Sequence, residues 1–195
     1  MSATAQATEE RPTQGSAPLI VVMGVSGSGK STIGELIAGR LTVPFIDGDA
    51  LHPLANVEKM ASGHALTDED RWPWLAKVGR ALTEADAGLV VACSALRRSY
   101  REAILAEAPA VLFVHLHGSR EVLASRLEGR TGHFMPAALL DSQFATLEPL
   151  DPDEPGIVVD ISPGVAEIVT DAVGRVHAHL ASRVDLASAD GRALS

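Results

Sequence analysis

The chain has 195 residues, of which 46% are hydrophobic and 21% are charged, a balance typical of one soluble globular domain. Its formal net charge of −9 argues against general nucleic-acid binding, because an acidic surface repels a phosphate backbone. The single cysteine, Cys93, excludes a disulfide framework and a cysteine-based metal site. The longest apolar runs, such as Leu19 to Met23, are far shorter than the roughly 20 residues of a membrane helix. Since the N-terminus carries no secretory signal either, we expect a cytoplasmic protein that does not bind membranes.

Short apolar runs alternate with amphipathic segments between two predicted tails, a disordered one at residues 1–17 and a flexible one at 182–195. Within residues 18–181, strands are predicted at 19–23, 43–46, 89–93, 111–116 and 157–160. Helices are predicted at 30–41, 53–61, 67–87, 99–107, 119–128 and 136–145, with a last one after Pro163. This alternation is typical of a three-layer α/β domain with a parallel sheet.

A glycine-rich loop directly follows the first predicted strand and precedes the first predicted helix. Its sequence, Gly24-Val25-Ser26-Gly27-Ser28-Gly29-Lys30-Ser31, has every fixed position of the phosphate-binding pattern G-x-x-x-x-G-K-[ST]. In such a loop the backbone N–H groups surround phosphate oxygens, and the helix N-terminus adds its positive end. Lys30 is expected to contact the terminal phosphates, and the Ser31 hydroxyl is an expected ligand of Mg²⁺. We therefore predict that residues 24–31, together with Thr32, bind a nucleotide.

The loop alone does not identify the phosphate acceptor, because switch GTPases, motor ATPases and small-molecule kinases share it. The second predicted strand ends in Asp47-Gly48-Asp49, and ligands gather at the carboxyl ends of parallel strands. One carboxylate there can hold Mg²⁺ through its water shell, and the other can accept a proton from an attacking hydroxyl. Switch GTPases and motor ATPases normally end the third strand with a metal-binding aspartate, but here Cys93 and Ser94 occupy that position. Asp47 is therefore the candidate for the metal.

Polar side chains follow this turn at high density. Those able to bond hydroxyl groups are His52, Asn56, Lys59, Asp70 and Arg71, and they suit a polyhydroxylated acceptor. A solvated pair of helices would carry the same residues, so both interpretations stay open. The two tryptophans nearby, Trp72 and Trp74, are interpreted as packing side chains.

Arginines form the last set of candidates. Arg97, Arg98 and Arg101 follow the third strand and are able to bind an anionic acceptor, although one or two of them are equally compatible with surface charges. Arg126 and Arg130 stand at a predicted helix end beside a glycine-containing loop, where mobile arginines neutralise a transferred group and exclude water. The helix dipole alone also favours cations at this position.

Taken together, these segments resemble the gluconate kinases, a branch of the small P-loop kinases. The resemblance covers about residues 19–180 and is carried by residues 24–32, 47–53, 56–63, 66–71, 93–101 and 126–134. The most specific parts are Asp-Gly-Asp followed by His-Pro within residues 47–53, and Lys-Met-Ala-Ser-Gly at residues 59–63. The resemblance implies a P-loop kinase fold with a five-stranded parallel sheet, a mobile lid at about residues 126–136, and a homodimer.

The resemblance also implies an activity and a role for each site residue. The implied reaction is the ATP-dependent phosphorylation of D-gluconate to 6-phospho-D-gluconate, with Mg²⁺ as cofactor. Asp47 would lie near Mg²⁺, and Asp49 would orient or deprotonate the acceptor hydroxyl. Lys30 and Arg130 would stabilise the transferring phosphate, with Arg126 beside the adenine. The expected gluconate contacts, besides Asp49, are His52, Arg71, Arg98 and His133.

Two other functions remain as alternatives. A kinase for another small hydroxylated acid, such as shikimate, would phosphorylate that acid and leave gluconate unchanged. A nucleotide-dependent switch without an acceptor would need a metal-binding carboxylate at the end of the third strand, and the sequence has none there. Release of ADP with each acceptor in turn separates the three functions.

Overall fold

The computed structural model describes residues 17–128 and 137–192, and its centre is a five-stranded parallel sheet. The strands are β1 (Leu19–Met23), β2 (Phe45–Asp47), β3 (Leu89–Ala92), β4 (Leu112–His117) and β5 (Gly156–Asp160), in the spatial order β2-β3-β1-β4-β5. Every neighbouring pair in this sheet is parallel. The predicted parallel α/β sheet is therefore confirmed, and each predicted strand agrees with an observed one to within two residues.

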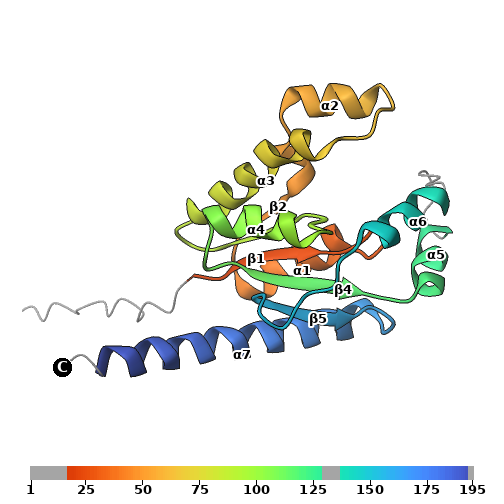
Figure 1. The fold of residues 1–195 in the computed structure, drawn as a ribbon. Coiled ribbons are helices and arrows are strands. Elements are labelled where there is room, and N and C mark those ends of the chain that lie inside the picture. The colour runs from red at the N-terminus through yellow and green to blue at the C-terminus, as the bar shows by residue number, and fades with distance from the viewer. Residues whose placement is uncertain (1–16, 129–136, 193–195) are drawn as a thin grey trace, which may run out of the picture.

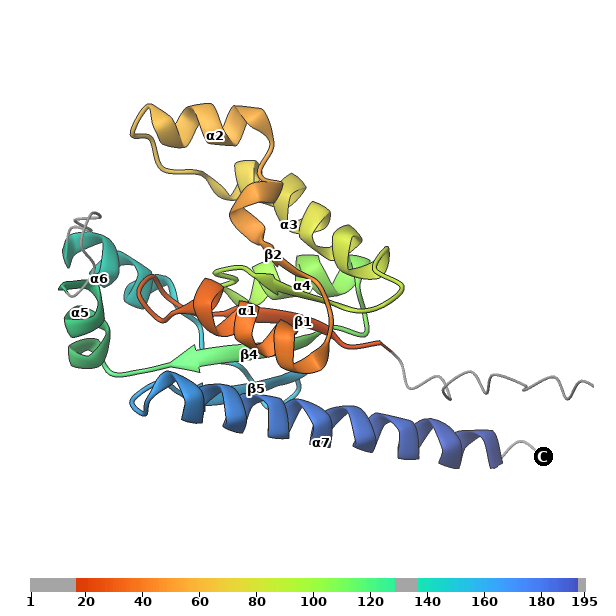
Figure 2. The same cartoon turned by 180° about the vertical axis from the view of Figure 1, so that it is seen from behind.

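Helices cover both faces of the sheet, as Figures 1 and 2 show. One face packs against α1 (Lys30–Leu41) and α7 (Val165–Arg192), and the other packs against α3 (Asp68–Thr83) and α4 (Arg98–Glu107). Successive side chains of a strand point to opposite faces, so Ile20 of β1 joins the first cluster and Val21 joins the second. The fold therefore has the three predicted layers.

The remaining helical segments surround the C-terminal ends of the parallel strands. They are η1 (Gly48–Leu51), a 3₁₀ turn directly after β2, then α2 (Leu54–Ala61), α5 (Arg120–Glu128) and α6 (Ala137–Thr146). Figure 1 shows α2 standing away from the sheet beyond α3, and α5 with α6 at the opposite side of these strand ends. These segments frame the region where ligands gather in parallel α/β sheets.

The start of α3 is a capping box formed by Thr67 and Asp70. The Thr67 hydroxyl accepts a hydrogen bond from Asp70 N, and Asp70 Oδ2 accepts one from Thr67 N at 2.7 Å. Lys59 Nζ also donates to Asp70 Oδ2 at 2.5 Å, and these bonds lower the pKa of Asp70 to about 2. Two polar residues considered for acceptor binding are therefore engaged in holding α2 to α3. The helix ends at Thr83, four residues before its predicted end, and Gly88, with a φ of 90°, lies directly before β3.

The last helix is longer than the sequence predicts. We expected helical structure to be lost from about residue 182, but α7 continues to Arg192. Residues 182–190 contain neither proline nor glycine, and extending an existing helix fixes only one residue for each new hydrogen bond. Arg183 Nη1 also donates to Ala110 O at 2.7 Å, which ties this part of the helix to the loop before β4.

The predicted N-terminal tail lies outside the described residues, apart from Ala17, and so does most of the predicted lid. Within residues 17–128 and 137–192, no helix combines the length and the apolar composition needed to cross a bilayer. Cys93 is buried directly after β3, as expected for a small packing side chain, and burial raises the pKa of its thiol to about 12.

Candidate active site

The glycine-rich loop connects the end of β1 to the start of α1. Gly24 has a φ of 140°, and a Cβ there would lie 2.8 Å from Leu116 O, so the site requires glycine. Gly29, with a φ of 90°, precedes the first residue of α1. The loop is fixed at its start by Gly24 N, which donates to Ser94 O at 3.3 Å, and Lys30 Nζ donates back to Val25 O at 3.2 Å. The backbone therefore has the curvature and the helix N-terminus that a phosphate-binding loop needs.

Ser31 and Asp47, the two predicted metal ligands, meet beside this loop. The Ser31 hydroxyl donates to Asp47 Oδ2 at 2.7 Å, while Asp47 Oδ1 accepts a bond from Asp49 N at 3.1 Å. Mg²⁺ usually keeps several waters and takes one or two protein oxygens plus substrate phosphates. In the described part of the chain no group of three or more histidine, cysteine or carboxylate residues could hold a metal ion. The Ser31–Asp47 pair therefore fits a metal that arrives with a nucleotide.

The turn that carries Asp47 and Asp49 is held in place by Trp74. The buried indole Nε1 of Trp74 donates to Gly48 O at 2.8 Å. A Cβ on Gly48 would lie 2.5 Å from Ala92 O, so only glycine allows the turn to approach β3 this closely. Trp74 packs in the core as expected, and it also fixes the backbone between the two carboxylates. The Asp49 side chain is left 87% exposed, so it can reach a bound substrate.

His52 lies on the same tryptophan. Its ring stacks on Trp74 with centroids 4.1 Å apart, and its Nε2 lies 4.0 Å from Asp49 Oδ1. Burial lowers the pKa of His52, Asp49 opposes the shift, and Arg71 adds to it. The Asn56 amide nitrogen lies 3.3 Å from His52 Nδ1, and an amide nitrogen only donates, so the neutral ring carries its proton on Nε2. This proton faces Asp49.

Arg71 belongs to a cluster that also contains Asp68, Arg97 and Tyr100. Both arginines donate to Asp68 at 2.9 Å through Nη1, one to each carboxylate oxygen, and the Tyr100 hydroxyl donates to Asp68 Oδ1 at 2.6 Å. These contacts lower the pKa of Asp68, with the Tyr100 hydroxyl as the largest cause. Both guanidinium groups also lie over the Tyr100 ring, at 5.5 and 5.7 Å from its centroid. The cluster thus places two cations around one anion.

Arg98 does not join this cluster, and the structure gives no support to its expected role as a gluconate contact. Its guanidinium binds Asp151 and Asp153, while its Nε donates to Glu102 at 3.0 Å. Three carboxylates surround this cation and raise its pKa, so acidic side chains of this protein already balance its charge. Arg101 is fully buried and pairs with Glu154 through two hydrogen bonds of 2.5 and 2.8 Å. Of the three arginines after β3, Arg97 is the one that pairs with Asp68 beside Arg71, although the sequence analysis did not single it out as a gluconate contact.

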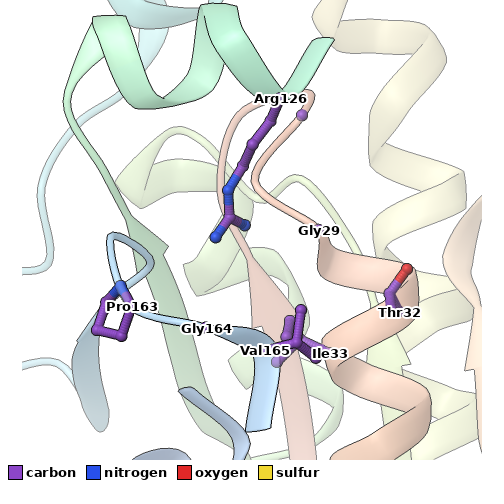
Figure 3. A pocket seen from close by; sticks show the side chains of 8 residues that line it. Gly29, Thr32, Ile33, Arg126, Pro163, Gly164 and Val165 are labelled. Carbon is purple, nitrogen blue, oxygen red and sulfur yellow. The ribbon is translucent and has the colours of Figure 1, made fainter. Parts of the chain in front are cut away.

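A cavity of about 370 Å³ lies on the other side of the phosphate loop (Figure 3). Its lining residues are Gly27, Gly29, Thr32, Ile33, Arg126, Pro163, Gly164 and Val165. The Arg126 side chain extends from α5 into the space between the start of α1 and the segment after β5, where its Nη2 donates to Ile161 O. Arg126 therefore lines this cavity, and its expected place beside the adenine stays a prediction. The segment at 163–165 was not predicted as a wall of the site, although it follows the carboxyl end of a strand.

Gln143 was also missed by the sequence analysis. Its Oε1 accepts a hydrogen bond of 2.6 Å from Ser26 N, in the middle of the phosphate loop. It belongs to α6, and Figure 2 shows this helix beside the loop that joins β1 to α1. A glutamine between the apolar Leu140 and Leu147, at helical spacing, is the signal that could have identified it. The predicted site residues Arg130 and His133 lie outside the described residues.

Comparison with known proteins agrees with this geometry. The AAA domain family model matches residues 19–150, and together with the sheet and the phosphate loop it defines a P-loop kinase fold. A gluconokinase from Gluconobacter oxydans is 53% identical over 156 residues, covering 78% of this chain and 88% of the relative. The thermosensitive gluconokinase of Escherichia coli is 44% identical over 153 residues, covering 76% and 81%. The crystal structure of a gluconokinase from Sinorhizobium meliloti superposes with a TM-score of 0.80 at 50% identity, covering 88% of this chain and 97% of that one. The chain therefore belongs to the gluconokinase family.

Proposed function

We propose that this protein transfers the terminal phosphoryl group of ATP to the 6-hydroxyl of D-gluconate, giving ADP and 6-phospho-D-gluconate. The observation that carries the proposal is the position of Asp49, which is exposed on a turn fixed by Trp74 and adjoins the Ser31–Asp47 pair. The gluconokinases that match over most of this chain support gluconate as the acceptor.

In the proposed complex, the nucleotide spans the phosphate loop and the cavity behind it. The phosphates lie against backbone N–H groups where the loop enters α1, at Gly29, Lys30 and Ser31, and the Lys30 ammonium offsets their charge. The adenosine occupies the cavity lined by Thr32 and Arg126, with the guanidinium beside the base. The remaining wall at Pro163–Val165 limits the size of the base that fits.

The oxygens of Ser31 and Asp47 would hold Mg²⁺. Their 2.7 Å hydrogen bond shows that both oxygens converge on one point beside the loop, which suits an ion with two protein ligands. An Mg²⁺ ion held by these two residues would neutralise charge on the terminal phosphates.

We assign proton removal from the acceptor to Asp49. The acceptor hydroxyl oxygen forms a bond to the γ-phosphorus, and the bond from that phosphorus to the oxygen shared with the β-phosphate breaks. The hydroxyl proton passes to the Asp49 carboxylate, and the electron pair of the broken bond leaves with ADP. The neutral His52, whose Nε2 lies 4.0 Å from Asp49 Oδ1, orients this carboxylate.

The carboxylate of gluconate is assigned to Arg71 and Arg97, in place of Arg71 and Arg98. Two guanidinium groups share the single Asp68 carboxylate, so the cluster carries one excess positive charge that a second carboxylate can balance. Arg71 is close enough to His52 to lower its pKa, which links this cluster to the Asp49 side of the site.

Several parts of the proposal rest on the family resemblance alone. Arg130, as a contact of the transferring phosphate, and His133, as a gluconate contact, lie outside the described residues and stay predictions. A homodimer is also proposed on this basis, whereas a cytoplasmic location is proposed from the composition of the sequence. Light scattering after gel filtration tests the dimer, and localisation of a tagged chain in cells tests the compartment.

The activity is tested by ADP release from ATP and Mg²⁺ with D-gluconate, shikimate or no acceptor. We expect strong release with gluconate and a product that carries the phosphate on its sixth carbon, detected by phosphorus NMR. Release with shikimate alone would keep a kinase and reject the substrate. Nucleotide binding without acceptor-dependent release would reject the kinase assignment.

A further inference from the structure

We infer that Gln143 is a positioning residue for phosphoryl transfer, which fixes Ser26 of the phosphate loop from α6 and stays there when nucleotide is bound. The kinetic part of its test rests on the proposed function, and the inference extends that function to a residue outside the phosphate-binding loop. It starts from one contact, the 2.6 Å hydrogen bond from Ser26 N to Gln143 Oε1, which joins residues 117 positions apart in the chain.

The helix that carries Gln143 is itself anchored on both sides. Leu140, one turn before Gln143, is buried in the cluster under α1 and α7, and Leu147, one turn after it, packs against both core clusters. Residues three and four apart share one face of a helix, so Gln143 lies between two packed side chains. Its position is therefore set by the core, and a bound nucleotide would have to disturb that packing to displace it.

The same helix also connects the nucleotide side to the acceptor side. In the middle of the helix, Asp141 pairs with Arg120 of α5, the helix that carries Arg126. Just after its end, Glu148 N donates to Leu96 O at 2.8 Å, next to Arg97. Buried Arg101 reinforces this end, because its Nη1 donates to Glu148 O at 3.1 Å. Gln143 thus holds the phosphate loop at a fixed place relative to the arginine assigned to the acceptor.

The position of Ser26 in the loop indicates which phosphate is affected. Gly27 and Gly29 line the nucleoside cavity, whereas Ser26 does not. The start of the loop, at Gly24, is bonded to Ser94 O, on the segment that leads to Arg97. Ser26 therefore belongs to the acceptor half of the loop, where the terminal phosphate must lie for transfer.

The chemistry of the side chain suits this position. A carboxamide accepts a hydrogen bond through its oxygen and offers two donors on its nitrogen, without any charge. A carboxylate of the same size would keep the acceptor for Ser26 N but would repel the triphosphate. Methionine has a similar length and flexibility but offers neither a strong acceptor nor a donor. The glutamate substitution therefore tests the lack of charge on the side chain, and the methionine substitution tests its hydrogen-bonding groups.

The experiment compares Gln143→Met, Gln143→Glu and the matched control Ser142→Ala, an exposed neighbour on α6. For Gln143→Met we expect kcat with gluconate to fall about 10- to 100-fold, because the terminal phosphate loses its preorganised loop. The dissociation constant for ADP should change less than about threefold, and Ser142→Ala should behave like the unsubstituted protein. For Gln143→Glu we expect calorimetry to show that the dissociation constant for ATP rises at least about tenfold more than the dissociation constant for ADP, because the added charge faces the third phosphate.

The nucleotide-binding arm needs no acceptor, so it distinguishes this inference from the proposed function. If the unsubstituted protein fails to phosphorylate gluconate but Gln143→Glu discriminates ATP from ADP as expected, the substrate is wrong and the position of Gln143 stands. If Gln143→Glu weakens ATP and ADP equally, or weakens neither, Gln143 does not face the terminal phosphate. A kcat of Gln143→Met equal to that of Ser142→Ala would overturn the positioning role.

Discussion

At the nucleotide side of the site, one continuous run from Gly24 to Thr32 supplies the backbone donors, the lysine and the hydroxyl. At the acceptor side, the side chains come from separate segments: Trp74 reaches Gly48, and both Arg97 and Tyr100 reach Asp68. The first region is determined by local backbone geometry, and the second by the packing of α3 against η1 and α4. Substitutions on the acceptor side should therefore change turnover or gluconate use while ATP binding is maintained.

The largest expected effect is that of Asp49→Asn. The amide keeps the shape of the side chain but cannot accept the hydroxyl proton as the carboxylate does, so kcat should fall about 10²- to 10⁴-fold. The dissociation constant for ATP should stay within about threefold, since the loop and the Ser31–Asp47 pair are unchanged. Steady-state kinetics with nucleotide titration measures both values. A kcat near that of the unsubstituted protein would remove Asp49 from the role of base.

A smaller effect, on gluconate alone, is expected for Arg97→Ala. Loss of one guanidinium from the Asp68 cluster should raise the KM for gluconate about 10- to 100-fold and leave the KM for ATP nearly constant. The neighbouring Arg98→Ala is the matched control and should change the KM for gluconate less than about threefold, because Arg98 faces Asp151 and Asp153. Equal effects of the two substitutions would reject the assignment of Arg97.

Trp74→Phe tests how far the acceptor side depends on packing. It removes the donor to Gly48 O in a buried position, which should lower the free energy of unfolding by about 1–3 kcal/mol. The less firmly held turn should reduce kcat about tenfold while ATP binding persists. Trp72→Phe provides the comparison, because Trp72 is partly exposed and contacts the Tyr100 ring edge-on. Denaturant unfolding and steady-state kinetics should show a larger loss of unfolding free energy and of kcat for Trp74→Phe than for Trp72→Phe. Similar losses in the two variants would show that the indole N–H of Trp74 is unimportant.

The smallest effect at neutral pH is expected from His115, a buried residue on β4 of the sheet. Burial lowers the pKa of His115 from 6.5 to about 4, and His117 and Arg101 act in the same direction. Between these values the unfolded chain binds a proton that the folded chain does not. The free energy of unfolding therefore does not depend on the protonation of His115 above pH 6.5. As the pH falls from 6.5 to 4, protonation of His115 in the unfolded chain lowers the free energy of unfolding by at most about 1.4 kcal/mol per pH unit.

Denaturant unfolding at pH 7, 6 and 5 checks this dependence. His115→Gln removes the titrating ring, so its free energy of unfolding should fall less steeply over this range than that of the unsubstituted protein. Equal slopes would mean that another group accounts for the loss.

The parts of the site that could be predicted from the sequence are those in which a short pattern determines the backbone. The strand at Leu19–Met23 and the helix at Lys30–Leu41 have their predicted bounds, because a glycine loop separates an apolar run from an amphipathic one. The capping box at Thr67 and Asp70 is equally local. The pairing of Ser31 with Asp47 also follows from topology, since both lie at the carboxyl edge of a parallel sheet.

The parts that could not be predicted depend on the direction of a side chain after packing. Arg97 and Arg98 are neighbours, but Arg97 precedes α4 with an extended backbone and Arg98 is the first helical residue. Their side chains therefore diverge, one to Asp68 and the other to Asp151 and Asp153. Gln143 was missed for a similar reason, because its partner in the phosphate loop is distant in sequence.

Cys93 gives the protein a practical property for labelling experiments. It is the single cysteine of the chain, it is 2% exposed, and its thiol stays protonated at ordinary pH. Maleimide probes react with the thiolate, so we expect them not to label the folded protein, and Cys93 need not be replaced before labelling. A cysteine introduced at an exposed position of α2, such as Glu58, would then be the single reactive thiol available for a fluorescent label.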